Sequence, residues 1–366
     1  MKTFLAALAS LFFVSIGFGS GDAQAKDDDL VVRRDVDKFA TLPDGVRFPE
    51  GITANPANGD IYVSTFDAPS PTNPNPNNKL LRFNRNGQLI GTRDFGKTPL
   101  LGLEFDRVHN KVYITNVGNF AGVDSKIQRV AADLSDLKDV GIIPGIGAPN
   151  QRIVDNPDGS SDTITFGSGA RVPNALAFDS GGNLYVSDSF QGAVFKITNP
   201  ESCAPNCNVT TFNHDPLLAT AGFPPFGANG LAFNKDESAL FIANTGDDRV
   251  LRLDIAMGKV SVFAESINGA DGIVFDEHGR LWVAANQADE VVALNAKGKI
   301  VVKLGEFRGI RKDGTPDGLL FPASPVIVDD EIFVTNLAIS LTPTAGDEPE
   351  EDVTRWTVSR MKLPKP

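Results

Sequence analysis

The sequence predicts an all-β protein, a six-bladed β-propeller with four antiparallel strands in each blade. A short phrase recurs six times, and each copy combines small or polar residues, an apolar pair, Asp or Asn, a turn and an apolar run. Segments between the turns are apolar or alternate with period two, which is typical of short strands. A repeat of about 40 to 55 residues per four-stranded unit indicates a propeller blade.

One aligned position is polar in five of the six copies. They read PEGITANPANGDIYVST, LLGLEFDRVHNKVYITN, PNALAFDSGGNLYVSDS, ANGLAFNKDESALFIANT, ADGIVFDEHGRLWVAAN and ASPVIVDDEIFVTN. Aligning their leading residues gives a column separated by intervals of 51, 73, 55, 42 and 53 residues. We call this set the column, and its predicted members are Glu50, Leu101, Asn174, Asn229, Asp271 and Ser324.

Each phrase supplies the first two strands of a blade. Turn dipeptides at 58–59, 181–182 and 278–279 (Asn-Gly, Gly-Gly and His-Gly) occupy the expected hairpin positions. A third strand follows, as in AVFKI from Ala193, and then a fourth, as in KVSVFAE from Lys259. The pattern therefore accounts for four strands in order.

The two ends of the chain are expected to close the ring. The segment VDKFATL at 36–42 resembles the fourth strand VSVFAES at 260–266. The sixth unit has two strands in its phrase and a third in RWTVSRMKL from Arg355. We expect the N-terminal strand to supply the missing fourth strand of the last blade.

Two insertions are longer than a turn requires. Residues 69–79 and 141–171 are polar and poor in strand-forming residues, so we expect loops there. Such loops are either rims or lids of a binding site, or solvated connections. The sequence leaves both interpretations open.

The first 25 residues are predicted to be a signal peptide, followed by the propeller domain at 26–366. Lys2 precedes an apolar run at 4–18, and Ala-Gln-Ala at 23–25 forms a small-x-small cleavage site. The run is short for a membrane span, although a single-pass anchor is the alternative. We expect cleavage after Ala25, a secreted or periplasmic protein, and no membrane association afterwards.

The chain has two cysteines, Cys203 and Cys207, in a loop rich in Pro and Asn. In an oxidising compartment a small-loop disulfide is the favoured interpretation. A redox role is less favoured because the spacing is not Cys-x-x-Cys. A metal site is less favoured because only His214 lies nearby.

Charge excludes one class of partner. There are 34 basic and 46 acidic residues, a net charge of -12, without any basic run. Phosphate backbones would be repelled, so we expect no nucleic acid as partner. A closed ring has no need of a second subunit, and we expect a monomer.

The column suggests a metal site. First strands line the axis of a propeller, so residues just before them converge at one channel mouth. Glu50, Asn174, Asn229 and Asp271 all offer oxygen, and two facing carboxylates would repel without a cation. Oxygen ligands suit calcium, or magnesium with more waters, whereas zinc prefers His and Cys. The alternative is that Asn and Asp only cap the strands through turn hydrogen bonds.

The phrases PEGI at Pro49, ANGLAF at Ala228 and ADGIVFDEHGRLWVA at Ala270 resemble the gluconolactonase, regucalcin and senescence-marker-protein family of six-bladed propellers. The paraoxonases have a similar channel arrangement. The resemblance implies a lactonase that binds a small-molecule ester and a divalent metal. Metal ligands would be Glu50, Asn229 and Asp271, with Asn174 as a fourth.

The resemblance also implies that the metal would polarise the lactone carbonyl. Asp271, or a metal-bound water beside it, acts as nucleophile or general base. The paraoxonase-like histidine pair is not evident, because the histidines are His109, His214 and His278. Residues that would grip a sugar lactone are not recognisable either, so the substrate stays unnamed.

Other interpretations remain open. YVSDSFQGAVFKI from Tyr185 and FIANTGDDRVLRLDI from Phe241 resemble NHL repeats, so the alternative function is a non-catalytic propeller that binds a protein or small ligand. A propeller like strictosidine synthase, without metal, is a third. Three phenylalanines after second strands would reach either the channel rim or the core: Phe66, Phe120 and Phe190.

Overall fold

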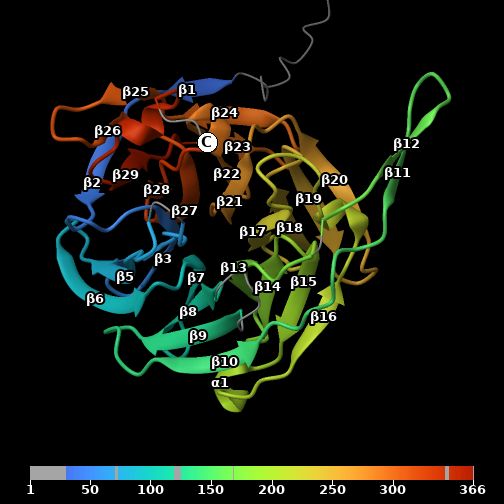
Figure 1. The fold of residues 1–366 in the computed structure, drawn as a ribbon, viewed down its shortest axis with the longest axis horizontal. Helices are drawn as coiled ribbons and strands as arrows, with labels where there is room; N and C mark the ends of the chain where they lie inside the picture. Colours follow the sequence, from blue (N-terminus) through green and yellow to red (C-terminus); the bar gives the residue numbers. More distant parts are fainter. Residues whose placement is uncertain (1–29, 71–72, 119–124, 168, 343–345, 366) are drawn as a thin grey trace, which may run out of the picture.

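Six antiparallel sheets stand around a common axis in the computed structural model, as Figure 1 shows. The structure describes residues 30–70, 73–118, 125–167, 169–342 and 346–365. The predicted six-bladed propeller is confirmed, with four antiparallel strands in each blade. The predicted signal peptide at 1–25 and Phe120 lie outside the described residues.

Strand order within each blade runs from the axis outward. Blade 1 contains β3 (Pro49–Ala54), β4 (Ile61–Thr65), β5 (Asn78–Phe83) and β6 (Leu89–Gly96). Blade 2 contains β7 (Leu100–Asp106), β8 (Lys111–Asn116), β9 (Lys126–Ala131) and β10 (Lys138–Ile142). Blade 3 contains β13 (Pro173–Phe178), β14 (Leu184–Asp188), β15 (Ala193–Ile197) and β16 (Val209–Asn213).

Blades 4 to 6 follow the same order. Blade 4 contains β17 (Ala228–Phe233), β18 (Ala239–Asn244), β19 (Arg249–Asp254) and β20 (Val260–Glu265). Blade 5 contains β21 (Ala270–Phe275), β22 (Leu281–Ala285), β23 (Glu290–Leu294) and β24 (Ile300–Leu304). Blade 6 contains β27 (Pro322–Val328), β28 (Glu331–Asn336), β29 (Thr357–Lys362) and, from the N-terminal part of the chain, β2 (Asp37–Thr41).

The predicted ring closure is confirmed. Strand β2 pairs antiparallel with β29, with Thr41 opposite Thr357. A short strand that the sequence did not predict, β1 (Val31–Arg33), adds in parallel to β24 of blade 5. The chain thus crosses from blade 5 to blade 6, and Val36 between the two strands is buried in the cluster that joins these blades. The N-terminal segment therefore ties blade 5 to blade 6.

The hydrophobic core lies between neighbouring blades. Second strands such as β4, β14 and β22 are buried at every position, because both faces of each sheet are covered. Trp282 on β22 is fully buried. Edge-to-face aromatic pairs join adjacent blades, including Tyr185 with Phe233 and Phe241 with Phe275 at ring-centroid distances of 5.0 and 5.2 Å.

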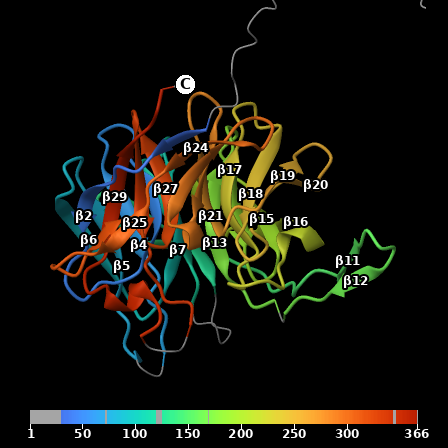
Figure 2. The same cartoon turned by 90° about the horizontal axis from the view of Figure 1, so that it is seen from above.

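One insertion differs from the prediction of a loop without strands. Residues 141–171 contain the hairpin of β11 (Arg152–Asp155) and β12 (Ser161–Ile164), which projects from the disc in Figures 1 and 2. Asn-Pro-Asp-Gly at 156–159 supplies its turn. Arg152 bonds Asp247 of blade 4 at 2.8 Å and so fixes the hairpin's base.

The remaining elements are short. They are α1 (Pro200–Cys203), η1 (Pro216–Leu218), η2 (Asn286–Ala288), η3 (Pro349–Asp352) and the hairpin of β25 (Phe307–Ile310) and β26 (Pro316–Gly318). The expected disulfide between Cys203 and Cys207 is present. Within the described ranges, none of the helices has the length and apolar character to cross a membrane.

Every innermost strand is irregular at the same place. The pairing of first and second strands shifts register at Pro49/Ile52, Leu100/Leu103, Pro173/Leu176, Ala228/Leu231, Ala270/Ile273 and Pro322/Pro325. Each shift leaves two residues of the first strand outside the regular ladder. Bulges of this kind re-aim side chains and are frequent beside functional sites. The column therefore occupies six equivalent bulges around the axis.

Hydroxyl groups on second strands hold the bulged backbones of successive blades together. Thr335 of β28 accepts a hydrogen bond from the Ser324 amide at 3.0 Å and donates one to the Glu50 carbonyl of blade 1 at 2.7 Å. Ser187 of β14 plays the same part between the Ala175 amide and the Asn229 carbonyl. These hydroxyls satisfy backbone groups that the bulges take out of the ladder.

Replacing Thr335 by Val should therefore destabilise the protein. Valine keeps the shape but leaves two buried backbone groups without a partner, which costs about 1 to 3 kcal/mol. Urea denaturation would measure the change in the free energy of unfolding. Thr163→Val in the exposed strand β12 is the control and should stay within about 0.5 kcal/mol of the parent. Equal effects of the two substitutions would show that the hydrogen bonds of the Thr335 hydroxyl contribute nothing to stability.

Candidate metal centre

The structure brings five of the six predicted column residues to equivalent bulge positions and corrects the sixth. Glu50, Leu101, Asn174, Asn229 and Asp271 each follow the first paired residue of a first strand. In blade 6 that residue is Pro322, so the column member is Ala323 and not Ser324. The sixth phrase has no glycine after the column residue, and its Ala-Ser pair at 323–324 resembles the Ala-Asp pair at 270–271 although the strand pairing places it one residue further on. Ser324 instead takes the place of Gly51.

Close backbone approach explains the residue that follows the column. A Cβ atom on Gly102 would collide with the Asn174 carbonyl, and one on Gly230 would collide with the Asp271 carbonyl. Blades 1, 2, 4 and 5 have glycine at this position because their first strands meet the neighbouring backbone with no room for a side chain, whereas blades 3 and 6 have Ala175 and Ser324. The same crowding brings the column residues of neighbouring blades together.

The polar column residues are buried. Glu50 and Asp271 are only 3% and 4% exposed, and Asn174 and Asn229 are similarly buried. No described residue donates a hydrogen bond to Glu50 Oε2 or Asp271 Oδ1, although both atoms are shielded from solvent. These two carboxylate oxygens thus lack a hydrogen-bond partner in the described part of the chain, an unfavourable situation for a buried polar group.

The two carboxylates influence each other. Burial raises the pKa of Glu50 well above its usual range, and the negative charge of Asp271 raises it further. Burial also raises the pKa of Asp271, while hydrogen bonds from Asn286 and Asn229 oppose this rise. Two like charges facing each other in a buried site favour a bound proton or a bound cation.

A second row of polar residues orients the column, and sequence reasoning missed its role. Ser189 accepts a hydrogen bond from Asn174 Nδ2 at 3.0 Å, and Thr245 accepts one from Asn229 Nδ2 at 2.9 Å. Asn286 Nδ2 donates to Asp271 Oδ2 at 3.0 Å. A signal for this row lies at the end of the third, fourth and fifth phrases, where the polar residue after the second strand lies beside the column residue of the same blade.

This arrangement bears on the alternative that the column asparagines only cap strands. The hydrogen bonds described for the Asn174 and Asn229 amide nitrogens go to side-chain hydroxyls and not to turn backbone. With its nitrogen engaged in this way, each carboxamide keeps its oxygen available as a ligand. These hydrogen bonds therefore hold the amide nitrogens of the two asparagines and do not form turns.

The donor set fits a hard divalent cation. It combines two carboxylates and two carboxamides, and oxygen-only sets of this kind suit calcium or magnesium. Asn229 and Glu50 both interact with Asp271, and Asn174 is joined through Ser189 to the Ala228 carbonyl next to Asn229. Among the described residues no three His, Cys, Asp or Glu side chains gather at one point, so the carboxamides are needed to complete any such site.

The histidines lie outside the column. His109 pairs with Asp106 at 2.7 Å in the turn after β7, and His278 lies in the turn after β21. His214 contacts the Gln191 carbonyl at 3.0 Å. None of them joins the metal candidates.

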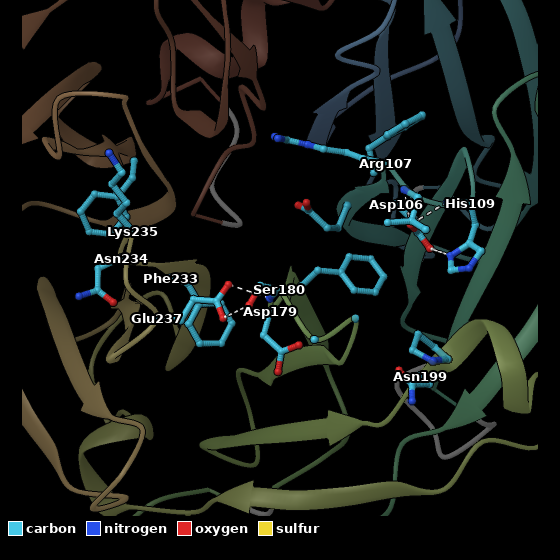
Figure 3. Close-up of a pocket in the computed structure, with 18 of the residues that line it drawn as sticks. Asp106, Arg107, His109, Asp179, Ser180, Asn199, Phe233, Asn234, Lys235 and Glu237 are labelled. Carbon is cyan, nitrogen blue, oxygen red and sulfur yellow. Dashed lines mark hydrogen bonds and ion pairs between the residues drawn. The ribbon is translucent and has the colours of Figure 1, made fainter.

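A cavity of about 1570 Å³ lies at the opposite mouth of the channel, and Figure 3 shows it. It is formed by the turns after β7, β13, β17 and β21 together with α1. Arg107 extends over it, and Ser180 is bonded to Glu237 at its edge. Glu104 lines both this cavity and the channel, and burial raises its pKa to about 7. The column does not line this cavity.

A narrower space lies along the axis between the column and the wide cavity. A space of about 280 Å³ extends from the glycines that follow the column, such as Gly51 and Gly272, to Glu104 and Phe178 at the wide cavity. Fold and site together define a six-bladed propeller with a ring of buried oxygen donors at one mouth and an open bowl at the other.

Comparison with known proteins supports the same class. Residues 201–305 match the family described as SMP-30/Gluconolactonase/LRE-like region. This match confirms the resemblance seen in the sequence. The matched segment contains Asn229 and Asp271, whereas Glu50 and Asn174 lie outside it. No curated protein matches the sequence.

Several solved structures share the fold. Regucalcin from Agrobacterium tumefaciens, a calcium-binding protein, has a TM-score of 0.57 and 15% identity over 90% of this chain and 94% of that chain. Virginiamycin B lyase from Staphylococcus aureus has a TM-score of 0.51 and 14% identity over 89% and 99%. A gluconolactonase from Xanthomonas campestris has a TM-score of 0.50 and 14% identity over 88% and 89%. At these identities the likeness shows the fold alone.

The buried carboxylates predict a pH-dependent stability in metal-free protein. The folded-state pKa of Glu50 lies above its unfolded value, so the folded state binds more protons and stability falls as pH rises above about 4. Glu50→Gln removes this effect and should be more stable than the parent at about pH 8, with a smaller difference at about pH 5. Urea denaturation in the presence of a chelator measures the difference in the free energy of unfolding at each of the two pH values.

The control for this prediction is Glu277→Gln, at a side chain that is 85% exposed. It should follow the parent at both pH values. Saturating calcium should reverse the order of the parent and Glu50→Gln, because Gln removes a charged ligand. Parallel pH curves for parent and Glu50→Gln would contradict the electrostatic account.

Proposed function

We propose that this protein is a metal-dependent hydrolase, most simply a lactonase, which opens a cyclic ester at the channel mouth that carries the column. The observation that carries the proposal is a pair of buried carboxylate oxygens, Glu50 Oε2 and Asp271 Oδ1, for which the described residues offer no hydrogen-bond partner. They face a ring completed by the carboxamides of Asn174 and Asn229. The family match over residues 201–305 supports the lactonase class.

The metal would be held by Glu50, Asn174, Asn229 and Asp271. Calcium is the first candidate because every donor is an oxygen, with magnesium or zinc as alternatives. A bound divalent ion supplies Lewis-acid polarisation of the ester carbonyl and offsets the charge of the two carboxylates.

The reaction itself is hydrolysis and needs no oxidant or reductant. Water adds to the lactone carbonyl carbon, the ring C–O bond breaks, and the ring oxygen takes up a proton to give a hydroxy acid. Asp271 would accept the proton of the attacking water or attack the carbonyl itself. Asn286 donates to Asp271 Oδ2, whereas Oδ1 has no hydrogen-bond partner among the described residues.

The second row serves positioning. Ser189 and Thr245 each accept from a column carboxamide, and Thr245 also donates to the Ala270 carbonyl at 2.8 Å. A residue bonded on two sides has few rotamers left, which keeps the donors in place before substrate binds. The site would therefore be preorganised by the same bulges that close the ring.

Asp271→Ala should abolish lactone hydrolysis while the protein stays folded, because one ligand and the proposed base are lost together. Hydrolysis of δ-valerolactone, followed by acid release, measures this. Asp330→Ala, at an exposed turn residue between β27 and β28, is the control and should keep parental rates. Retained hydrolysis in Asp271→Ala would refute the assigned role.

Calcium should also stabilise the parent protein in a thermal or urea titration. Ligand at about 100 times Kd adds about 2.7 kcal/mol of stability. Asp271→Ala should lose most of that gain. If neither calcium, magnesium nor zinc shifts stability and no lactone is hydrolysed, the alternative of a non-catalytic propeller that binds a protein or small ligand is favoured.

We also propose that the mature protein is exported, as a secreted or periplasmic monomer. The disulfide between Cys203 and Cys207 supports an oxidising compartment. Mass spectrometry of the exported protein should find an N-terminus at Lys26. A retained leader would favour the membrane-anchored alternative.

A further inference from the structure

The wide cavity and the narrow axial space meet at a neck that the proposed hydrolysis does not use. Four described residues line both spaces and so form this neck: Glu104, Phe178, Phe233 and Phe275. The three phenylalanines end the first strands of blades 3, 4 and 5, and each is half-buried. The neck therefore places one carboxylate beside aromatic rings, with the large open volume of the wide cavity on its outer side.

Glu104 is an exception within the repeat. It lies three residues after the column position of blade 2 and is the one ionisable side chain among the described residues that line the axial space. The fold does not require a carboxylate there, because the other five blades have small, apolar or hydroxyl side chains at this position. These residues are Thr53, Ala177, Ala232, Val274 and Val326.

The carboxylate of Glu104 has no hydrogen bond and no ion pair within the described part of the chain. Burial raises its pKa to about 7, the positive charge of Arg107 opposes this rise, and the charge of Asp106 adds to it. Arg107 is exposed and extends over the wide cavity in Figure 3, and Asp106 is paired with His109 at 2.7 Å. An ionised Glu104 is thus shielded from water without a partner, which a bound cation would supply.

The charge of the wide cavity favours cations. Eight of its described lining residues are Asp or Glu, whereas Arg107 and Lys235 are the lining residues of the Arg or Lys type. A cleft lined by one sign of charge attracts ligands of the opposite sign. A metal ion would find a single carboxylate among apolar side chains at the neck, and hard cations need several oxygen ligands. An organic cation with an apolar part fits these surroundings better.

We propose that the neck binds a small primary amine with an unbranched alkyl chain, at a site separate from the proposed metal centre. The ammonium group would donate a charge-assisted hydrogen bond to Glu104. The alkyl chain would lie against Phe178, Phe233 and Phe275 on the side of the wide cavity. Aromatic rings favour both parts of such a ligand, because they remove apolar surface from water and attract cations.

The first test compares ligands that share a chain length and differ in charge. Hexylamine, hexanol and hexanoate are titrated by calorimetry at about pH 8, where the amine is protonated and Glu104 is mostly ionised. Hexylamine should bind at least about tenfold more tightly than hexanol, because its hydrogen bond to Glu104 joins two charged groups. Hexanoate should bind most weakly. Methylamine, which lacks the chain, should bind at least about tenfold more weakly than hexylamine.

Two variants assign the binding to Glu104. Glu104→Gln keeps the shape and removes the charge, so it should weaken hexylamine at least about tenfold while hexanol stays within about twofold. Glu277→Gln is the matched control, because Glu277 lines the same cavity and its side chain is 85% exposed. Arg107→Gln should strengthen hexylamine binding, since it removes a positive charge above the neck.

The pH dependence of the parent protein does not rely on any variant. Because an ammonium ion binds the ionised form of Glu104, the affinity for hexylamine should rise about tenfold between about pH 6 and about pH 8. The charged groups that act on Glu104 are Arg107 and Asp106, from the turn after its own strand, and the equivalent positions of the other blades hold no titratable residue. Glu104→Gln should abolish the rise, whereas a rise that came from His109 beside Asp106 would persist.

Several outcomes would overturn the amine site. They are equal binding of hexylamine and hexanol, equal effects of Glu104→Gln and Glu277→Gln, or a pH profile that survives Glu104→Gln. Hexylamine should bind equally in a chelator and in saturating calcium, and displacement by calcium would assign the neck to a metal instead. A capped Gly-Lys-Gly peptide carries the same ammonium group on a lysine side chain, and tighter binding of this peptide than of hexylamine would overturn the assignment to a free amine. None of these measurements depends on lactone turnover.

Discussion

Crowding at the axis is the constraint on which this structure depends. Six first strands meet so closely that the backbone carbonyl of one blade lies against the Cα of the next, as at Gly102 and Gly230. The strands respond with a bulge, and the bulge removes backbone groups from the ladder. Hydroxyls such as those of Ser187 and Thr335 pair with these groups across the blade boundary. The same bulges and hydrogen bonds therefore both join the blades and position the column residues.

The same constraint creates the chemistry of the mouth. Residues from distant parts of the chain become neighbours in a buried ring, and two of them, Glu50 and Asp271, are carboxylates. A ring of apolar residues would close the channel at lower electrostatic cost. A metal is proposed because two buried carboxylates lie close together. Beside them lie carboxamides whose nitrogen atoms already donate hydrogen bonds. The fold alone does not imply it, because similar propellers carry different activities.

Polar and apolar residues beside the axis lie on different blades. Blades 3 to 5 provide hydrogen-bonded polar residues in the column and the second row, whereas blades 6, 1 and 2 provide buried apolar side chains around Glu50. A propeller suits this division because each blade contributes one column residue and one second-row residue. The wide cavity at the far mouth is likewise built from equivalent positions of several blades, here the turns after the first strands. It holds none of the proposed metal ligands.

The sequence by itself determined the number of blades, the closing strand β2 and four of the buried oxygen residues, because period-two strands and turn dipeptides repeat with the phrase. It did not determine β1, the hairpin β11–β12 or the correct sixth column residue. Ala323 and Ser324 differ by one position, and strand register is decided by pairing with β28. Only the tertiary structure revealed what the second row does. Asn286 acquires its role from its hydrogen bond to Asp271 of the neighbouring strand, and the pairing of β21 with β22 decides the register that brings the two side chains together.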